Sequence, residues 1–152
     1  MNKNMILSML LIIVLLYFPA MIMVSDPITL NDMKIQYTYF NSKGEVEFGE
    51  IKNGQELAIF MRYGDQFLVK IWNYTDEDFY LDKDQPFNII EGQDFIYIES
   101  DTDTRIPAGM CVSFWIFMDI FSNERKRGVI EIRSENSEDK DFVFGLWKDM
   151  SC

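Results

Sequence analysis

After residue 26, apolar and polar residues alternate in short runs, and this alternation constrains the fold more than any other feature of the sequence. In one such run, Val69 and Ile71 fall on one face of an extended chain and Lys70 falls on the other. Side chains repeat at every second residue in a strand but at every 3.6 residues in a helix, and no long stretch after the first 25 residues has the helical period. The pattern predicts an all-β protein.

The runs are separated by turn residues, mainly Gly, Asn, Asp and Ser. They predict strands at Met33–Phe40, Glu45–Lys52, Glu56–Tyr63, Phe67–Asn73, Phe79–Leu81, Phe87–Ile90, Asp94–Ile98, Met110–Ile120, Gly128–Ser134 and Asp141–Trp147, with an acidic loop at Asp101–Arg105. Asn53-Gly54 is the strongest short hairpin signal in the chain. The spacing of strands and turns is typical of a sandwich of two antiparallel sheets.

A sandwich core requires apolar side chains at every second position of the strands that enclose it. The chain supplies such a set, which we expect to point inward: Val69, Ile71, Phe79, Leu81, Val112, Phe114, Ile116, Met118, Ile130, Ile132, Phe142, Phe144 and Leu146. Abundant Phe and Tyr favour strands in the same way.

The first 25 residues form a separate segment. Met5–Val24 is an apolar run that follows Lys3 and ends before Asp26. Such a run is typical of a secretory signal peptide, and its length also suffices for a helix that spans a bilayer of about 30 Å. Both alternatives predict a targeting segment at residues 1–25 and an exported domain at 26–152. The domain would lie outside the cell, in the periplasm or at the cell surface, with membrane contact only through residues 5–24.

Charge and missing residue types exclude several classes of function. The formal net charge of −11 repels phosphate backbones, so nucleic acid is not an expected partner. The chain has no histidine, which excludes Ser–His and Cys–His nucleophile pairs and histidine-ligated zinc. Cys111 and Cys152 are the two cysteines; they could pair in an oxidising compartment but make no disulfide framework.

Several short motifs, taken in order, resemble a known family. They are Val46-Glu47-Phe48-Gly49-Glu50-Ile51, Phe67–Asn73, Asp78-Phe79-Tyr80-Leu81, Ile106-Pro107-Ala108-Gly109, Phe114-Trp115-Ile116-Phe117, Gly128–Ser134 and Phe142–Leu146. In this order the chain resembles the immunoglobulin-like domains called choice-of-anchor D, which are similar to the abnormal-spindle and hydin (ASH-type) domains. It departs from them at Thr75, where the family often has glycine, and Glu56–Tyr63 is a candidate extra strand. The resemblance implies an immunoglobulin-like β-sandwich that acts as a protein-interaction module.

Paired carboxylates are the candidate catalytic groups. The pairs are Asp76 and Asp78, Asp82 and Asp84, Asp101 and Asp103, and Asp139 and Asp141. Glycosidases and aspartic proteases use carboxylate pairs, but these lie in predicted turns among other charges, where nothing apolar shifts their pKa. Clustered acids could also bind Ca²⁺, yet no EF-hand spacing is present. We therefore expect no catalytic residue, no metal site and no cofactor.

Two features of the central strands suggest modification or binding. Asn73-Tyr74-Thr75 is an N-glycosylation sequon, and Asn73 is equally suited to end its strand as a turn residue. Trp72, Trp115 and Phe117 are expected to point away from the core, on strands that are neighbours in the sandwich the resemblance implies. Exposed aromatic clusters mark binding surfaces. Alternatively, Glu56–Tyr63 or the first predicted strand covers these rings.

These observations predict a non-catalytic module that binds a protein partner or has a structural role, through exposed sheet edges among other surfaces. A carbohydrate-binding module, with Trp72, Trp115 and Phe117 as a stacking platform, is the alternative. A hydrolase that uses paired aspartates is a third hypothesis, and it requires a concave site that a compact sandwich seldom offers.

Overall fold

The computed structural model describes residues 26–100, 103–119, 124–136 and 141–149. Its strands are β1 (Lys34–Phe40), β2 (Val46–Ile51), β3 (Gln55–Met61), β4 (Gln66–Trp72), β5 (Phe79–Tyr80), β6 (Phe87–Glu91), β7 (Ile96–Glu99), β8 (Arg105–Ile106), β9 (Cys111–Met118), β10 (Lys126–Ile132) and β11 (Phe142–Lys148). A single 3-10 turn, η1 (Leu30–Asp32), precedes β1 and is capped by Thr29. The predicted all-β fold is confirmed, and the predicted targeting helix lies outside the described residues.

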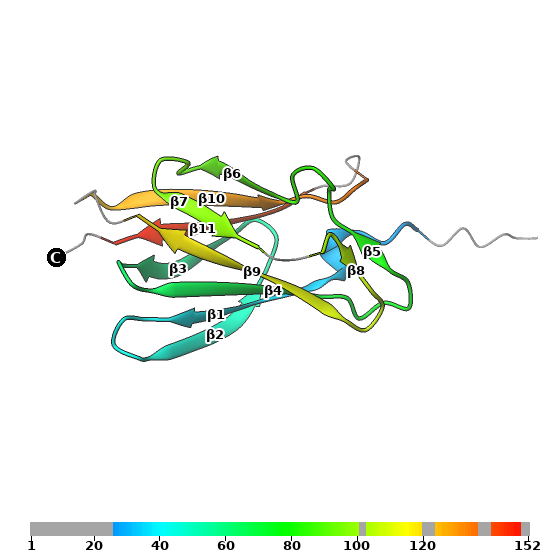
Figure 1. The fold of residues 1–152 in the computed structure, drawn as a ribbon, viewed down its shortest axis with the longest axis horizontal. Helices are drawn as coiled ribbons and strands as arrows, with labels where there is room; N and C mark the ends of the chain where they lie inside the picture. Colours follow the sequence, from blue (N-terminus) through cyan, green and yellow to red (C-terminus); the bar gives the residue numbers. More distant parts are fainter. Residues whose placement is uncertain (1–25, 101–102, 120–123, 137–140, 150–152) are drawn as a thin grey trace, which may run out of the picture.

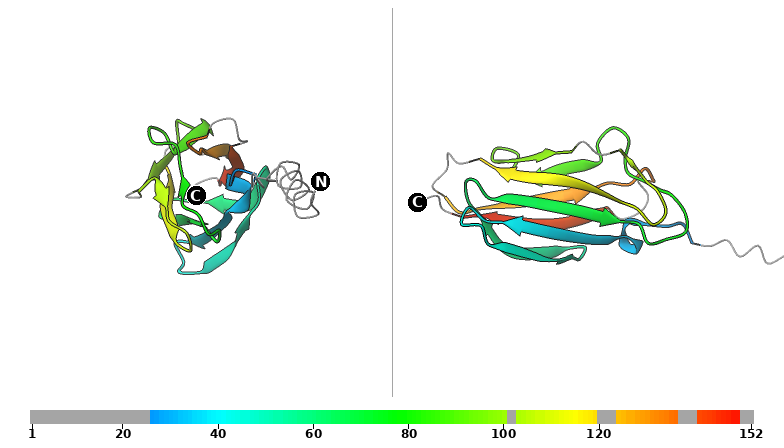
Figure 2. Two further views of the ribbon diagram at one scale, coloured as in Figure 1. Left: turned by 90° about the vertical axis from the view of Figure 1, so that its right-hand side faces the viewer. Right: turned by 60° about the horizontal axis from the view of Figure 1, so that its bottom comes forward.

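The strands form two large sheets that pack face to face (Figure 1). The first sheet has the order β2-β1-β4-β9-β7, and the second has the order β3-β11-β10-β6. The left view of Figure 2 looks nearly along the strands and shows the sheets as two layers. Strands β5 and β8 form a small separate sheet at the end where the described chain begins. Within the described ranges, no helix is long and apolar enough to cross a membrane.

The strand order is that of an immunoglobulin sandwich with two additions. In the constant-type fold, strands A, B, E and D form one sheet, and strands C, F and G form the other. Here β1, β4, β9 and β7 take the first set of positions, and β6, β10 and β11 take the second, all in chain order. The additions are β2, at the edge beside β1, and β3, which pairs with β11. The predicted immunoglobulin-like sandwich is therefore confirmed.

The core lies between the two sheets, and its composition follows the alternation in the sequence. Every side chain predicted to point inward is buried. Phe114 of the first sheet is 0% exposed, and its ring lies 4.0 Å from that of Phe87 in the second sheet. Tyr37 and Phe67 stack at 5.3 Å within the first sheet. Large aromatic groups thus fill the space between the layers, where each buries a large apolar area.

The prediction of a hairpin at Asn53-Gly54 is wrong. β2 and β3 belong to different sheets, and β3 runs parallel to β11. A type I′ hairpin needs a positive φ at both central residues, but only Gly54 has one, at +77°. The Gly54 N–H donates to the Val143 carbonyl at 2.6 Å, and Asn53 Oδ1 accepts from the Val143 N–H at 2.9 Å. The turn is therefore bonded to β11 and carries the chain from one sheet to the other.

Candidate binding surface

The outer face of the first sheet carries the side chains that point away from the core. On β9, Phe114, Ile116 and Met118 are buried, so the alternating Trp115 and Phe117 point outward. β9 pairs with β4 on one side and with β7 on the other. The predicted adjacency of the two strands that carry Trp72 and Trp115 is therefore confirmed.

Four rings from three strands meet on this outer face. The Phe40 and Trp115 centroids are 6.2 Å apart, and those of Trp115 and Phe117 are 6.4 Å apart. Tyr97 on β7 stacks on Phe117 at 5.5 Å with an interplanar angle of 22°. Tyr97 and Phe117 lie directly opposite one another on β7 and β9, and such a cross-strand aromatic pair contributes about 0.2–1 kcal/mol to sheet stability. The four rings form one continuous cluster.

The edge strand β2 extends this cluster. Val46 lies opposite Phe40, and Phe48 follows it on the same side of β2. Val46 is 55% exposed, Phe48 79% and Tyr97 55%. Apolar surface is normally removed from water, so such exposure at neighbouring positions indicates a binding surface. We call Phe40, Val46, Phe48, Tyr97, Trp115 and Phe117 the aromatic face.

Trp72 does not belong to the aromatic face, although sequence reasoning grouped it with Trp115 and Phe117. It lies opposite Cys111, whereas Trp115 lies opposite Leu68. Trp72 stacks on Tyr74 with centroids 5.8 Å apart and an angle of 5°, and its buried Nε1 has no hydrogen-bond partner among the described residues. The structure therefore brings Trp115 and Phe117 together and leaves Trp72 toward the other end of the sheet.

Neither segment that was expected as a cover lies over the aromatic face. The segment Glu56–Tyr63 largely corresponds to β3, which lies in the second sheet. The first strand, β1, lies beside β4 within the first sheet and contributes Phe40 to the face itself. Figure 1 shows no other described strand stacked outside the first sheet. The alternative that these segments bury the rings is therefore wrong.

Sequence reasoning did not find Phe40, Val46, Phe48 or Tyr97. Each lies at a position of its strand that alternation places on the side away from the core, and that signal was available in the sequence. Alternation alone does not show which strands are neighbours, nor the register in which two neighbouring strands pair. The pairing of Tyr97 with Phe117 depends on that register, which only the folded structure supplies.

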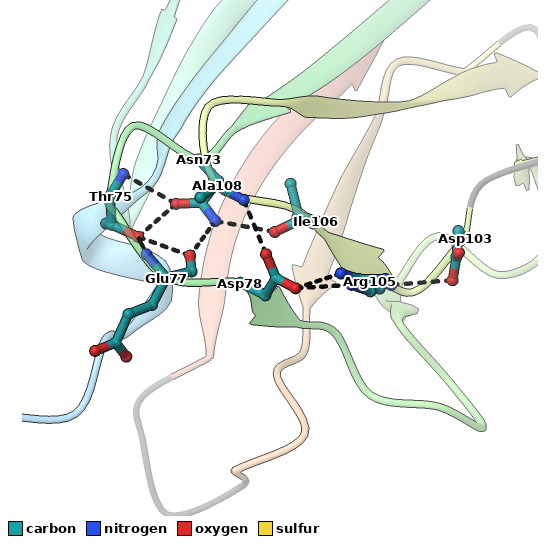
Figure 3. Close-up of polar contacts among 8 residues, drawn as sticks. All are labelled: Asn73, Thr75, Glu77, Asp78, Asp103, Arg105, Ile106 and Ala108. Atoms are coloured by element: carbon teal, nitrogen blue, oxygen red, sulfur yellow. Dashed lines mark hydrogen bonds and ion pairs between the residues drawn. The ribbon is translucent and has the colours of Figure 1, made fainter.

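Asp78, one of the paired carboxylates, has a structural role (Figure 3). Its Oδ2 accepts from Arg105 Nε at 2.8 Å and Nη2 at 2.6 Å, and its Oδ1 accepts from the Ala108 N–H at 3.1 Å. The hydrogen bonds from Arg105, and then the one from Ala108, hold the pKa of Asp78 below its ordinary value. Asp78 therefore stays ionised and joins β5 to the loop after β8.

The other carboxylate pairs form no catalytic arrangement that the described residues show. Asp82 Oδ1 accepts from the N–H groups of Asp84 and Gln85, which lower the pKa of Asp82. Burial raises the pKa of Asp141, whose Oδ1 has no partner within the described ranges. Asp101 and Asp139 lie outside those ranges. Among the described residues, no group of three or more His, Cys, Asp and Glu could hold a metal ion.

Asn73 is fully buried and organises the loop after β4 (Figure 3). Its Nδ2 donates to the carbonyls of Glu77 at 2.8 Å and Ile106 at 2.9 Å. Its Oδ1 accepts from the N–H and the hydroxyl of Thr75, at 3.0 and 2.7 Å. Both amide hydrogens are therefore used inside the fold, and a glycan on Nδ2 is incompatible with this arrangement.

A hollow of about 310 Å³ lies at the end of the sandwich opposite β5 and β8, beside Tyr39, Arg62, Asp65 and Asp149. Three of its charged groups, Arg62, Asp65 and Asp149, already have partners. Asp65 accepts from the Tyr39 hydroxyl and the Arg62 N–H, and Asp149 pairs with Arg62 at 2.9 Å. Burial, followed by the hydrogen bond to Asp65, raises the pKa of Tyr39. These contacts join the loops that surround the hollow.

Comparison with protein-family models, curated proteins and solved structures gives no match to this chain.

Proposed function

We propose that the protein is a non-catalytic, exported binding module that holds a protein partner on the aromatic face. The single observation that carries this proposal is the continuous cluster of Phe40, Trp115, Phe117 and Tyr97, which no described segment covers. Exposed apolar patches rimmed by polar groups are typical of interaction sites. The apolar run Met5–Val24 supports export, and the resemblance to choice-of-anchor D domains supports an interaction role.

The ring geometry favours a protein over a sugar. A sugar-stacking platform needs ring faces that lie open to solvent. Tyr97 and Phe117 instead stack against one another at 22°, and Trp115 and Phe117 at 26°. Stacked rings cover part of each other's faces and present edges. Such a surface suits apolar side chains from a partner, which pack against ring edges and aliphatic groups alike.

The test compares two tryptophans on opposite faces of the sandwich. Trp115→Ala in the full-length chain should abolish capture of the partner from the native cell envelope. The melting temperature should fall by less than about 5 °C, because the ring is only partly buried. Trp147→Ala is the matched control: Trp147 is also partly buried and contacts one ring, Phe60, but on the outer face of the second sheet.

The control variant should retain capture. Equal capture by wild type and by Trp115→Ala would contradict the proposal. A loss of about 3–5 kcal/mol in the free energy of unfolding would also contradict it, because that loss is typical of a buried tryptophan.

A further inference from the structure

The edge strand β2 offers an unpaired row of backbone groups directly beside the aromatic face. The Asn41 N–H donates to the Glu45 carbonyl at 3.0 Å. This bond fixes which residues of β2 turn their backbone N–H and C=O toward β1. In an antiparallel ladder every second residue turns both its N–H and its C=O toward the partner strand. In β2 these are Glu47, Gly49 and Ile51. The N–H and C=O of the residues between them point to the free edge.

The free-edge residues are Val46, Phe48 and Glu50. Their side chains lie on the outer face, and Phe48, at 79%, is the most exposed large apolar residue that the structure describes. Figure 1 shows β2 at the margin of the sandwich with no described strand beyond it. Edge strands attract additional strands unless they are short or covered. β7, at the other margin, contributes Tyr97 but has only four residues against six in β2.

The charges of β2 identify the chemistry of an occupant. The strand contains Glu47 and Glu50 and no cation, and the whole chain has a net charge of −11. Two copies of a chain with this net charge repel one another, so a second copy of this chain is a poor occupant of the edge. A segment with basic residues opposite the two glutamates would gain a favourable pair at each position.

We propose that β2 receives an extended, basic segment of a partner protein as a sixth strand of the first sheet; the inference rests on the proposed function. An antiparallel orientation is the more stable one. Opposite Val46 and Phe48 the segment carries apolar residues, which continue the aromatic face. Opposite Glu47 and Glu50 it carries Lys or Arg. Read from its N-terminus, the segment has the pattern basic, any residue, apolar, basic, apolar.

The probe is the blocked peptide Thr-Lys-Thr-Val-Lys-Val-Thr, added to the full-length protein in mild detergent. Amide hydrogen exchange at Val46, Phe48 and Glu50 should slow at least tenfold, because these N–H groups become hydrogen-bonded. The same peptide with Glu in place of Lys should bind on the order of tenfold more weakly or not at all, since two attractive cross-strand pairs become repulsive. Equal binding of the two peptides would overturn the charge assignment.

A proline variant tests the backbone contact directly. Glu50→Pro removes an N–H that faces the free edge and leaves the β1–β2 ladder intact, as prolines do on edge strands. It should weaken peptide binding about tenfold beyond the effect of Glu50→Gln, which removes the same charge but keeps the N–H. A peptide N-methylated at the valine opposite Phe48 gives the same test on unaltered protein. Full binding by that peptide would overturn the proposal.

The remaining outcomes separate the proposals from one another. If Trp115→Ala abolishes partner capture but Glu50→Pro does not, the aromatic face binds and the strand proposal fails. If the β2 amides become protected as the protein concentration rises without peptide, the occupant is a second copy and the strand proposal fails. If Trp115→Ala leaves capture unchanged, the proposed function itself fails.

Discussion

At the scale of single residues, Asn73 shows how one amide can define the end of a strand. Its four hydrogen bonds join the loop after β4 to Ile106 of β8. Both donors and both acceptor positions of the side chain are used, so no other residue type of this size fits. The prediction of a strand-ending turn residue is confirmed, whereas the sequon belongs to a side chain with no accessible amide.

We expect Asn73→Ala to lower the free energy of unfolding by about 2–4 kcal/mol, because it leaves the buried carbonyl of Ile106 without its donor. Asn73→Asp should be at least as damaging, since a carboxylate oxygen would face two carbonyls. Denaturant unfolding measures both. Asp76→Ala, an exposed acid in the same loop, serves as the control and should stay within about 0.5 kcal/mol of wild type.

Asp78 makes the stability depend on pH. Its pKa is lowered in the folded protein, mainly by Arg105, from an ordinary value of 3.8. The stabilisation is therefore present above that value and is lost as the pH falls through the folded pKa. Asp78→Asn should be less stable than wild type at pH 7 and should lose less on acidification. Thermal melts from pH 7 to pH 2 test this. Asp103→Asn removes the same charge nearby. If its melting temperature fell as little on acidification as that of Asp78→Asn, the assignment of the pH dependence to Asp78 would be wrong.

At the scale of the element, β9 separates the two faces of its sheet residue by residue. Phe114 is fully buried against Phe87, whereas the adjacent Trp115 points outward. Phe114→Ala should therefore cost about 3–5 kcal/mol, as large-to-small core changes do. Ile132→Ala, on the opposite sheet, should cost about 2–5 kcal/mol. Denaturant unfolding gives both values. A loss at Phe114 no larger than that at Trp115 would show that the alternation along β9 is wrong.

Elements were predicted better than their connections. Period-two alternation located the strands and the buried set, because that pattern is a direct consequence of strand geometry. It missed β8, whose two residues are too few to show a period. Asn53-Gly54 correctly indicated a turn with a positive φ at glycine, but the partner of β3 was decided by bonds to Val143, 90 residues after Asn53. Distant contacts of this kind leave no local signal in the chain.

At the scale of the whole molecule, the two outer faces differ in chemistry. The first sheet presents the aromatic face. The second presents an ion-pair ladder in which Arg127 contacts both Glu56 and Glu91. Each of these pairs is solvent-exposed and contributes little to stability. The second outer face thus combines these ion pairs with one aromatic contact, that of Phe60 with Trp147, whereas the first carries the larger aromatic cluster. The alternation along single strands could not reveal this asymmetry.

The last described strand is central to the second sheet. β11 lies between β3 and β10, so removing it leaves β3 without a neighbour. A chain that ends at Asn136 should therefore show no cooperative thermal unfolding. Adding a peptide of residues 141–149 should restore it, because the peptide supplies both missing strand pairs. A cooperative melt of the shortened chain on its own would show that β11 is dispensable.

The parallel pairing of β3 with β11 also has a consequence for biosynthesis. A ribosome makes β3 long before it makes β11, and the strand that completes the second sheet is the last of those described. The second sheet therefore cannot close before β11 has been synthesised. Any cellular step that requires an unfolded chain is therefore favoured until the β11 segment has been made, because β3 has no permanent neighbour before that point.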